Sequence, residues 1–506
     1  GYWDATVDLK DTKRNPSTNE VSADLLVRPG PLHKLATPAI NSTQTVDTEL
    51  LELLGSVGGQ VADTETIKKT RKSVDDHYRE HGYQYADVRM NATHNAGVTQ
   101  LTFTFDPGRQ FRVGNITLKG VEDTDPGRIS RRFDRFHGQY YDVDAVNKQV
   151  NRLYGTGAFK SLQFVEHPRE DGYLDLTLHV DEGKPTGYYL YGGAGSYEGF
   201  ILGAGYYHRN LFNRLYSFRA QAEYTGIGLL GDVQLSNPFF LERDLTATAR
   251  LYILTRQREG YDKTELGLNF SLDWRVNEHY RLEGHFNNAI ATITSTGIPT
   301  EDLGPTDYGV HVLGVTQSFD FREAAVANSE GFLGRLTTDL GFTLGGTSVG
   351  FLRTEGQGTY YWPWTEKNHF SFGLRGGTMI PSTSEELPID LRYFTGGANS
   401  VLSFPEREMG PQARTGDPRG GEAYWVANAE YIRGIKGPIK GVFFFDAGSL
   451  AENHDELFAS EVELAVGLGL RINLPIGPVR FEYGYNLTED GDEDSGAFHF
   501  AIGSAF

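Results

Sequence analysis

One stretch near the C-terminus, residues 461–474, limits the folds open to this chain more than any other. Its sequence, EVELAVGLGLRINL, places an aliphatic side chain at every second position and a charged, polar or small residue at each position between. A period of two indicates a β-strand whose two faces meet different surroundings. A strand of about 10 residues crosses a bilayer at a tilt, with apolar residues on lipid and polar residues on the lumen. The stretch therefore predicts a strand of a transmembrane β-barrel.

The same alternation recurs along the chain after Pro185, where helical spacing is no longer found. We count sixteen candidate strands, an even number that suits a closed barrel. They begin near residues 186, 199, 215, 229, 244, 263, 280, 308, 331, 349, 369, 422, 439, 461, 477 and 496. The sequence thus predicts a 16-stranded antiparallel transmembrane β-barrel over residues 186–506. Its long loop, residues 380–421, separates the eleventh strand from the twelfth.

Composition agrees with a barrel and excludes several other classes. The 506 residues include 61 Gly, 27 Tyr and 31 Phe, while only 39% are hydrophobic, as expected for strands that are apolar on one face. No run of 18 apolar residues occurs, which excludes a helical membrane protein. The absence of Cys excludes disulfides and thiolate metal sites. A net charge of −20 argues against a nucleic-acid partner, which would need a basic surface.

The N-terminal part carries a spaced repeat. The turn dipeptides Pro29-Gly30, Pro107-Gly108 and Glu182-Gly183 each follow an alternating strand, at spacings of 78 and 75 residues. Like elements at a fixed spacing indicate a repeated module. We predict α+β repeats at residues 31–108 and 109–185. Residues 1–30 are predicted to be the C-terminal half of another repeat, whose exposed apolar surface favours further residues upstream.

Each full repeat is predicted to contain a capped helix. In the first, Asp63 or Thr64 caps a helix that ends at Gly82. Its apolar face is predicted to be Ile67, Val74 and Tyr78. In the second, a strand at 111–118 is followed by a helix that Asp142 caps. The apolar residues at helical spacing there are Val143, Val146, Val150, Leu153 and Tyr154.

No residues point to catalysis or to a bound metal or cofactor. Residues 346–350, GTSVG, match the Gly-x-Ser-x-Gly hydrolase motif, but that motif needs a strand–turn–helix context and a strand follows here. The acidic run at 489–494 lacks the calcium-loop pattern and is interpreted as a solvated loop. The 14 His residues show no metal-ligand spacing. We therefore expect a protein that is not an enzyme and has no metal or cofactor.

Three local motifs resemble those of one family. Residues 392–401, RYFTGGANSV, are similar to the approach to the sixth extracellular loop of the BamA/TamA superfamily. The Phe-x-Asp-x-Gly motif of that family is matched by Phe444, Asp446 and Gly448, and the terminal FHFAIGSAF resembles its β-signal. The family's barrels follow polypeptide-transport-associated (POTRA) repeats. The resemblance covers the whole chain and implies this same architecture.

The tip of the long loop departs from the family pattern. The family's Val-Arg-Gly-Phe/Tyr is replaced here by Val401, Leu402, Ser403 and Phe404. The resemblance implies that the family Arg pairs in the lumen with the carboxylate that Asp446 represents, and Leu402 cannot make that pair. A buried carboxylate without a cation is costly unless it is solvated. We therefore predict that Arg407 or another lumenal Arg approaches Asp446.

The first and last strands, about 186–197 and 496–506, must pair to close the barrel. The residues expected to shape this seam are Gly187, Gly192, Gly193 and Gly195 in the first strand, and Phe498, Phe500, Ile502 and Phe506 in the last. The glycines give the first strand little side-chain packing and extra backbone freedom. These residues alone leave open whether the seam is permanently closed. The resemblance implies that it opens to template incoming strands by edge pairing.

The resemblance also implies a function. It indicates a bacterial outer-membrane assembly factor with its repeats in the periplasm, in contact with lipid and with unfolded outer-membrane protein clients. The repeats offer sheet edges for clients and for a periplasmic or inner-membrane partner. One alternative is a two-partner-secretion transporter that passes an extended polypeptide through the lumen. Another is a lipid-handling or structural barrel tethered to a periplasm-spanning partner.

Overall fold

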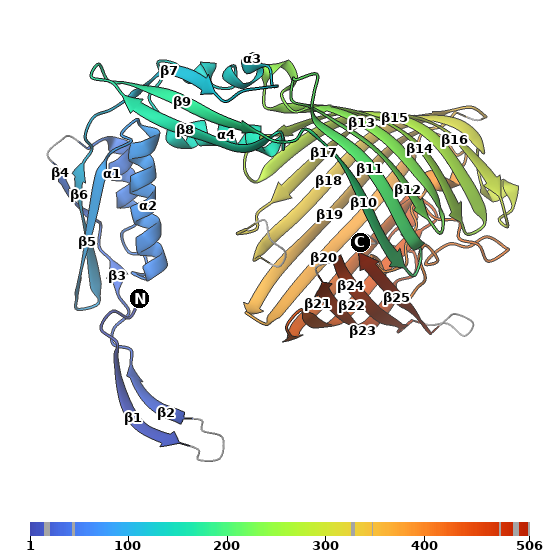
Figure 1. Ribbon diagram of the computed structural model, residues 1–506. Helices are drawn as coiled ribbons and strands as arrows, with labels where there is room; N and C mark the ends of the chain where they lie inside the picture. The colour runs from blue at the N-terminus through green and yellow to red at the C-terminus, as the bar shows by residue number, and fades with distance from the viewer. Residues whose placement is uncertain are drawn as a thin grey trace. The chain divides into compact units, whose positions relative to one another are not determined.

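The computed structural model describes residues 1–14, 21–42, 46–324, 329–346, 348–474, 477–488 and 495–503. The chain forms two compact units, Gly1–Gly183 and Lys184–Phe506. The first combines helices with small sheets, and the second is built of long strands joined by turns and loops (Figure 1). Among the described residues, no helix is long and apolar enough to cross a membrane.

The second unit is a closed barrel in which each strand pairs antiparallel with its neighbours in chain order (Figure 1). The described residues form the sixteen strands that the sequence predicts, and each begins within two residues of its predicted start. They are β10 (Thr186–Gly195), β11 (Gly199–Leu211), β12 (Tyr216–Thr225), β13 (Gly228–Asn237), β14 (Leu245–Arg258), β15 (Tyr261–Arg275), β16 (Tyr280–Ser295), β17 (Asp307–Asp320), β18 (Gly331–Leu344), β19 (Gly350–Thr365), β20 (Asn368–Pro381), β21 (Ala423–Lys436), β22 (Ile439–Ala451), β23 (Glu463–Leu474), β24 (Gly477–Asn486) and β25 (Gly496–Gly503). The fold prediction is confirmed.

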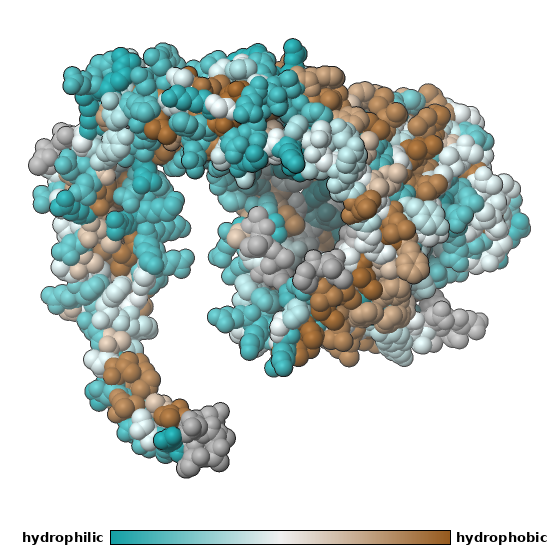
Figure 2. All heavy atoms as spheres, in the orientation of Figure 1, coloured by the Kyte–Doolittle hydropathy of each residue, from teal (hydrophilic) through white to brown (hydrophobic). Residues whose placement is uncertain are grey.

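The barrel wall has the two faces that a period of two predicts. In β23, Ala465 is buried on the inside, whereas Leu468 is 67% exposed on the outside. In β22, Phe444 is buried while Phe443 and Phe445, on either side of it, are exposed. Figure 2 shows apolar residues gathered on the outer surface of the strands that face the viewer. This outer face is suited to contact with lipid acyl chains.

Residues 31–108 fold as two helices against one sheet. The central strand β6 (Val98–Asp106) pairs in parallel with β3 (Lys34–Leu35) and β4 (Ala39–Ser42), and antiparallel with β5 (Asp87–Asn95). The helices are α1 (Thr48–Gly55) and α2 (Thr64–Glu80).

The predicted cap and apolar face of α2 are both confirmed. The Asp63 side chain accepts the backbone N–H of Thr66 at 2.7 Å. The predicted face of Ile67, Val74 and Tyr78 is buried with the strand residues Leu101 and Phe103.

Residues 109–185 repeat this plan. β7 (Arg112–Lys119) and β8 (Phe159–Pro168) flank β9 (Tyr173–Glu182), and the helices are α3 (Pro126–Ser130) and α4 (Val143–Gly155). Asp142 caps α4 as predicted, by accepting the backbone N–H of Ala145 at 2.8 Å. Val146 and Leu153 are buried. Tyr154, which the spacing also placed on the apolar face, is 53% exposed and lies in the last turn of α4.

In residues 1–30, β1 (Thr6–Arg14) pairs antiparallel with β2 (Val21–Arg28), and both strands are exposed on both faces. The chain before β1 is attached to the next repeat, because Asp4 pairs with His33 at 2.8 Å and Trp3 stacks on His94 at 4.4 Å. The assignment of this strand pair to half a repeat, and the boundaries at residues 30, 108 and 185, stay predictions.

The long loop, residues 382–422, turns inward and packs against the barrel wall. Leu387 and Ile389 are buried in one cluster with Tyr261 of β15, Tyr308 of β17 and Phe351 of β19. A second cluster joins Val401 and Met409 to Val426 of β21 and Leu450 of β22. The loop therefore contacts the inner wall on two sides, which fixes where its tip lies.

Candidate functional site: the barrel seam and the lumenal loop

The base of the long loop is fixed by charged side chains. Asp390 accepts the hydroxyl of Tyr308 at 2.5 Å and lies 2.5 Å from the Nζ atom of Lys263. The same Lys263 contacts Glu265, one position along the same face of β15, at 2.5 Å. Paired in this way, the buried charges hold the loop base against β15 and β17.

Arg407 lies on the same side of the lumen and does not approach Asp446. Its Nη2 atom donates to the hydroxyl of Tyr261 at 2.8 Å, and its guanidinium lies 3.5 Å from the ring centre of Phe394. Burial lowers the pKa of this guanidinium from its ordinary value. The prediction that Arg407 approaches Asp446 is wrong. The chain turns over Pro405–Glu408, where the Glu408 N–H donates to the Pro405 carbonyl at 3.4 Å. Beyond the tip, Arg407 contacts Tyr261 of β15, whereas Leu402 in the tip contacts β22.

The carboxylate of Asp446 is instead satisfied by neutral donors. It is 1% exposed, and it accepts the backbone N–H of Leu402 at 3.2 Å and the Asn428 amide at 2.7 Å. The Asn428 amide also donates to the carbonyl of Ser400 at 2.9 Å. Among the described residues, no cation lies within ion-pair distance of Asp446. Backbone and amide hydrogen bonds therefore connect the loop tip to β21 and β22.

The loop tip, residues 401–404, fits closely against this part of the wall. The side chain of Leu402 is buried with Phe444 and Val442 of β22. A Cβ atom at Gly448 would lie 2.8 Å from Val401, and one at Gly484 would lie 2.4 Å from the backbone of Leu402. Glycine at both positions is what lets the tip approach β22 and β24 this closely.

Residues that the sequence analysis missed extend the contact to the last strands. His499 of β25 is 3.1 Å from the carbonyl of Leu402, and Arg480 of β24 donates to the carbonyl of Ala398 at 3.3 Å. Arg480 also pairs with Glu482, which is bound in turn by Arg471 at 2.8 Å. The only available signal was that these polar residues occupy lumen-facing positions in their strands.

The seam between β10 and β25 is short among the described residues. Only Gly193, Ala194 and Gly195 of β10 pair with described residues of β25, opposite Gly503, Ile502 and Ala501. One further hydrogen bond joins the Ser196 N–H to the Phe500 carbonyl at 2.9 Å. The rest of β10 pairs, within the described chain, with β11 alone.

The other predicted seam residues have different neighbours. Gly187 and Gly192 pair with Tyr207 and Leu202 of β11, and Phe498 pairs with Tyr483 of β24. Phe506 lies outside the described residues.

The inner face next to the seam is covered by tyrosine rings. Tyr189 and Tyr191 of β10 lie across Gly205 and Gly203 of β11, where a Cβ atom would clash with the rings. Their hydroxyls donate to Gln221 and Glu223 of β12 at 2.8 and 2.9 Å. The first strand is thus well packed toward β11, and its weak side is the one that faces β25.

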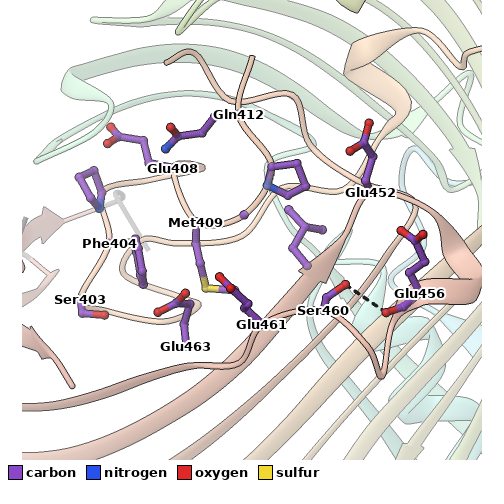
Figure 3. A pocket seen from close by; sticks show the side chains of 14 residues that line it. Ser403, Phe404, Glu408, Met409, Gln412, Glu452, Glu456, Ser460, Glu461 and Glu463 are labelled. Atoms are coloured by element: carbon purple, nitrogen blue, oxygen red, sulfur yellow. Dashed lines mark hydrogen bonds between the residues drawn. The ribbon is translucent and has the colours of Figure 1, made fainter. Parts of the chain in front are cut away.

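A cavity of about 780 Å³ opens beside the loop tip (Figure 3). Ser403 and Phe404 form one side of it, and Glu461 and Glu463 approach it from the start of β23 (Figure 3). Further acidic residues, Glu408, Glu452 and Glu456, line the rest. The cavity is therefore strongly acidic and is bounded directly by the loop.

One group of side chains in the repeat at 31–108 has the arrangement of a metal site. His77 lies in the last turn of α2, and His81, four residues on, caps its C-terminus, so the two side chains lie near each other at this helix end. With Glu49 of α1 they form a group whose ligand atoms lie within 4.8 Å of one another. The sequence analysis missed this group because its acidic member comes from a different helix.

Comparison with known proteins assigns this architecture to a protein family. Residues 210–506, more than half of the chain, match the Omp85 superfamily domain. The chain belongs to the Omp85 superfamily. Residues 40–108 match the POTRA model, described as a surface antigen variable number repeat. The resemblance to the BamA/TamA superfamily with POTRA repeats is confirmed.

This Omp85 chain is similar to curated assembly proteins along its whole length. It is 24% identical to outer membrane protein assembly factor BamA of Nitratidesulfovibrio vulgaris, over 100% of this chain and 66% of that relative. It is 27% identical to sorting and assembly machinery component 50 homolog B of Xenopus laevis, over 66% of this chain and 75% of that relative. The chain spans about two thirds or less of the first curated relatives that it matches.

Solved structures share the fold. BamA from Haemophilus ducreyi lacking POTRA domains 1–3 matches with a TM-score of 0.69 at 17% identity, over 93% of this chain and 99% of that one. CdiB from Acinetobacter baumannii matches with a TM-score of 0.54 at 12% identity, over 94% of this chain and 90% of that one. The Omp85 barrel resides in the bacterial outer membrane, with the POTRA repeats in the periplasm.

Proposed function

We propose that the chain helps β-barrel clients to insert and fold in the outer membrane, with the seam between β10 and β25 as the place where client strands add. Strand addition exchanges one set of backbone hydrogen bonds for another, so it requires no catalytic residue and no cofactor. The names of the curated relatives, assembly factor BamA and sorting and assembly machinery component 50, agree with such a role.

The shortness of the seam carries this proposal. Among described residues, β10 has three residue pairs with β25 but ten with β11, and the next shortest ladder of the barrel, β24 with β25, has seven. Unpaired backbone groups are costly inside a bilayer, so a long ladder would resist opening. A short ladder can open, and a client strand that pairs with the freed edge of β10 restores the lost hydrogen bonds.

The repeats have sheet edges that suit extended clients. In the described part of the first unit, β5 pairs only with β6, and β8 pairs only with β9, which leaves the other edge of each strand open. An extended segment can add to such an edge through main-chain hydrogen bonds. We propose that periplasmic clients bind there before they reach the barrel.

Reconstitution tests the proposal. The full chain is placed in liposomes, and folding of an unfolded eight-stranded outer-membrane barrel is followed by its altered gel mobility and protease resistance. We expect insertion severalfold faster than in protein-free liposomes. Equal rates would overturn the proposal. Passage of an extended polypeptide into the vesicles without barrel insertion would support the two-partner-secretion alternative.

A further inference from the structure

Four metal-ligating side chains meet where the start of α1 approaches the end of α2. Asp47 and Glu49 lie at the N-terminus of α1, and His77 and His81 lie one turn apart at the C-terminal end of α2. The two imidazole rings are 4.4 Å apart between ring centres. The group lies in the repeat at 31–108 and takes no part in the seam or the lumenal loop.

The distances in this group are close to those of a coordination shell. The Nε2 atom of His77 is 2.8 Å from the Asp47 carboxylate, and the Nε2 atom of His81 is 3.7 Å from the Glu49 carboxylate. Ligand atoms at about 2.0–2.1 Å around a tetrahedral zinc ion lie about 3.3–3.4 Å from one another. Glu49, His77 and His81 already place ligand atoms within 4.8 Å of one another, and Asp47, which contacts His77 at 2.8 Å, must rotate to join them.

The orientation of His81 indicates a ligand. Its Nδ1 atom lies 2.7 Å from the backbone carbonyl of His77, and since a carbonyl only accepts, Nδ1 carries the hydrogen. In the neutral ring the Nε2 lone pair then points toward Glu49, so that two electron-pair donors face each other. A backbone hydrogen bond that fixes the tautomer in this way is the usual support of a metal-binding histidine.

The burial of the four residues also suits a held ion. The His77 side chain is 5% exposed and is therefore fixed in place, whereas Glu49 is 73% exposed and can adjust. Asp47 accepts the backbone N–H of Leu50 through its other oxygen at 2.8 Å, which leaves one carboxylate oxygen directed at His77. The fixed His77 side chain and the adjustable Glu49 side chain together allow the ligands to rotate onto the ion.

We propose that Asp47, Glu49, His77 and His81 bind one Zn²⁺ ion. Two imidazoles and two carboxylates supply four ligands of the types that zinc accepts, and the two carboxylates balance its charge. The ion would join the first turn of α1 to the last turn of α2. Because the bound ion favours the folded state, it would stabilise this repeat by an amount that rises with the logarithm of the free zinc concentration once that concentration exceeds the dissociation constant.

Metal titration of the full chain in detergent micelles tests this site. After treatment with a chelator, Zn²⁺ is added and followed by calorimetry, and Co²⁺ is added and followed by its visible absorption. We expect one Zn²⁺ per chain and the intense absorption bands of tetrahedral Co²⁺. The absence of a one-to-one site, or Co²⁺ bands typical of six-coordinate water, would overturn the proposal.

Variants at His81 and Glu49 distinguish zinc binding at this site from binding to unrelated histidines. His81→Asn and Glu49→Gln should each lower zinc affinity at least tenfold, with unchanged folding as judged by circular dichroism. His454→Asn is the matched control, because His454 is a partly exposed histidine that pairs with a single carboxylate, Glu422, at 2.9 Å in the barrel unit. Loss of affinity in the control, or none in His81→Asn and Glu49→Gln, would contradict the assignment.

Discussion

The carboxylate of Asp446 accepts the backbone N–H of Leu402 at 3.2 Å in the lumen of the barrel, where no cation of the described residues lies within ion-pair distance of it. A hydrogen bond to the backbone does not depend on which side chain stands at position 402. It explains how the loop tip stays on β22 although Leu replaces the Arg that the family pattern contains. The Leu402 side chain adds an apolar contact with Phe444 in place of an ion pair.

Asp446→Ala should release the loop tip. The variant leaves the Leu402 N–H and one N–H of the Asn428 amide without an acceptor, and each buried unpaired group costs about 1–3 kcal/mol. We expect a lower thermal midpoint and faster protease cleavage within residues 382–422. Asp232→Ala is the control, because Asp232 is a buried carboxylate of β13 that pairs with Arg250. Equal cleavage of the loop in both variants would show that Asp446 does not hold the tip.

Gly484→Ala should displace the tip by steric contact. A Cβ atom there would lie 2.4 Å from the backbone of Leu402, closer than two non-bonded atoms can approach. We expect a lower thermal midpoint and increased loop cleavage, of the same kind as for Asp446→Ala. In the control Gly284→Ala the new Cβ atom of β16 meets nothing within 4 Å, so loop cleavage should not change. An unchanged loop in Gly484→Ala would contradict the close approach.

A disulfide across the seam should block client insertion. The chain contains no Cys, and Ala194 and Ile502 are register partners, so Ala194→Cys with Ile502→Cys places a single pair at disulfide distance. Oxidation should abolish the acceleration of client folding, and reduction should restore it. Val479→Cys with Ile502→Cys closes the neighbouring β24–β25 ladder instead and should leave activity unchanged. Full activity of the oxidised seam pair would exclude opening at this seam.

Glu406→Gln should change how loop docking depends on pH. Burial raises the pKa of the Glu406 carboxyl, with Arg407 and Arg375 opposing the change. A raised pKa means that its contribution to stability is complete below the unfolded value of about 4.3 and is lost as the pH rises through the higher folded value. At pH 7 the loop of Glu406→Gln should therefore resist protease better than the wild type, and at pH 4 the two should agree.

The surface variant Glu301→Gln serves as the control for this pH dependence. Glu301 is exposed and pairs with Arg414 at 3.0 Å, a kind of ion pair that contributes little. Its loop should resist protease to the same degree as the wild type at both pH values. A Glu406→Gln variant that behaves like Glu301→Gln would show that burial of Glu406 does not affect docking.

Features set by residues close in the chain were predictable. The period of two in 461–474 predicts a strand with one lipid-facing side, and β23 has that form. The caps at Asp63 and Asp142 follow from a hydrogen bond that spans three residues. Such features depend on local backbone geometry, so one stretch of sequence is enough to specify them.

The contacts of the candidate site were not predictable in the same way. Asp446 is bound by residues 18 and 44 positions away, and His77 by one 30 positions away. The closeness of Arg407 to the loop tip in sequence suggested that it replaces the family Arg beside Asp446, but Arg407 donates to Tyr261 instead. The partners of a charged group depend on which walls the folded loop reaches.

The sequence by itself determined the barrel, its number of strands and the helices of the repeats, because alternation and capping act over a few residues. The tertiary structure alone decided that the seam is joined by three pairs of described residues, that neutral donors satisfy Asp446, and that Glu49 meets His81. These relationships join segments distant in the chain. Closure of the barrel and packing of the helices determine which of those segments come together.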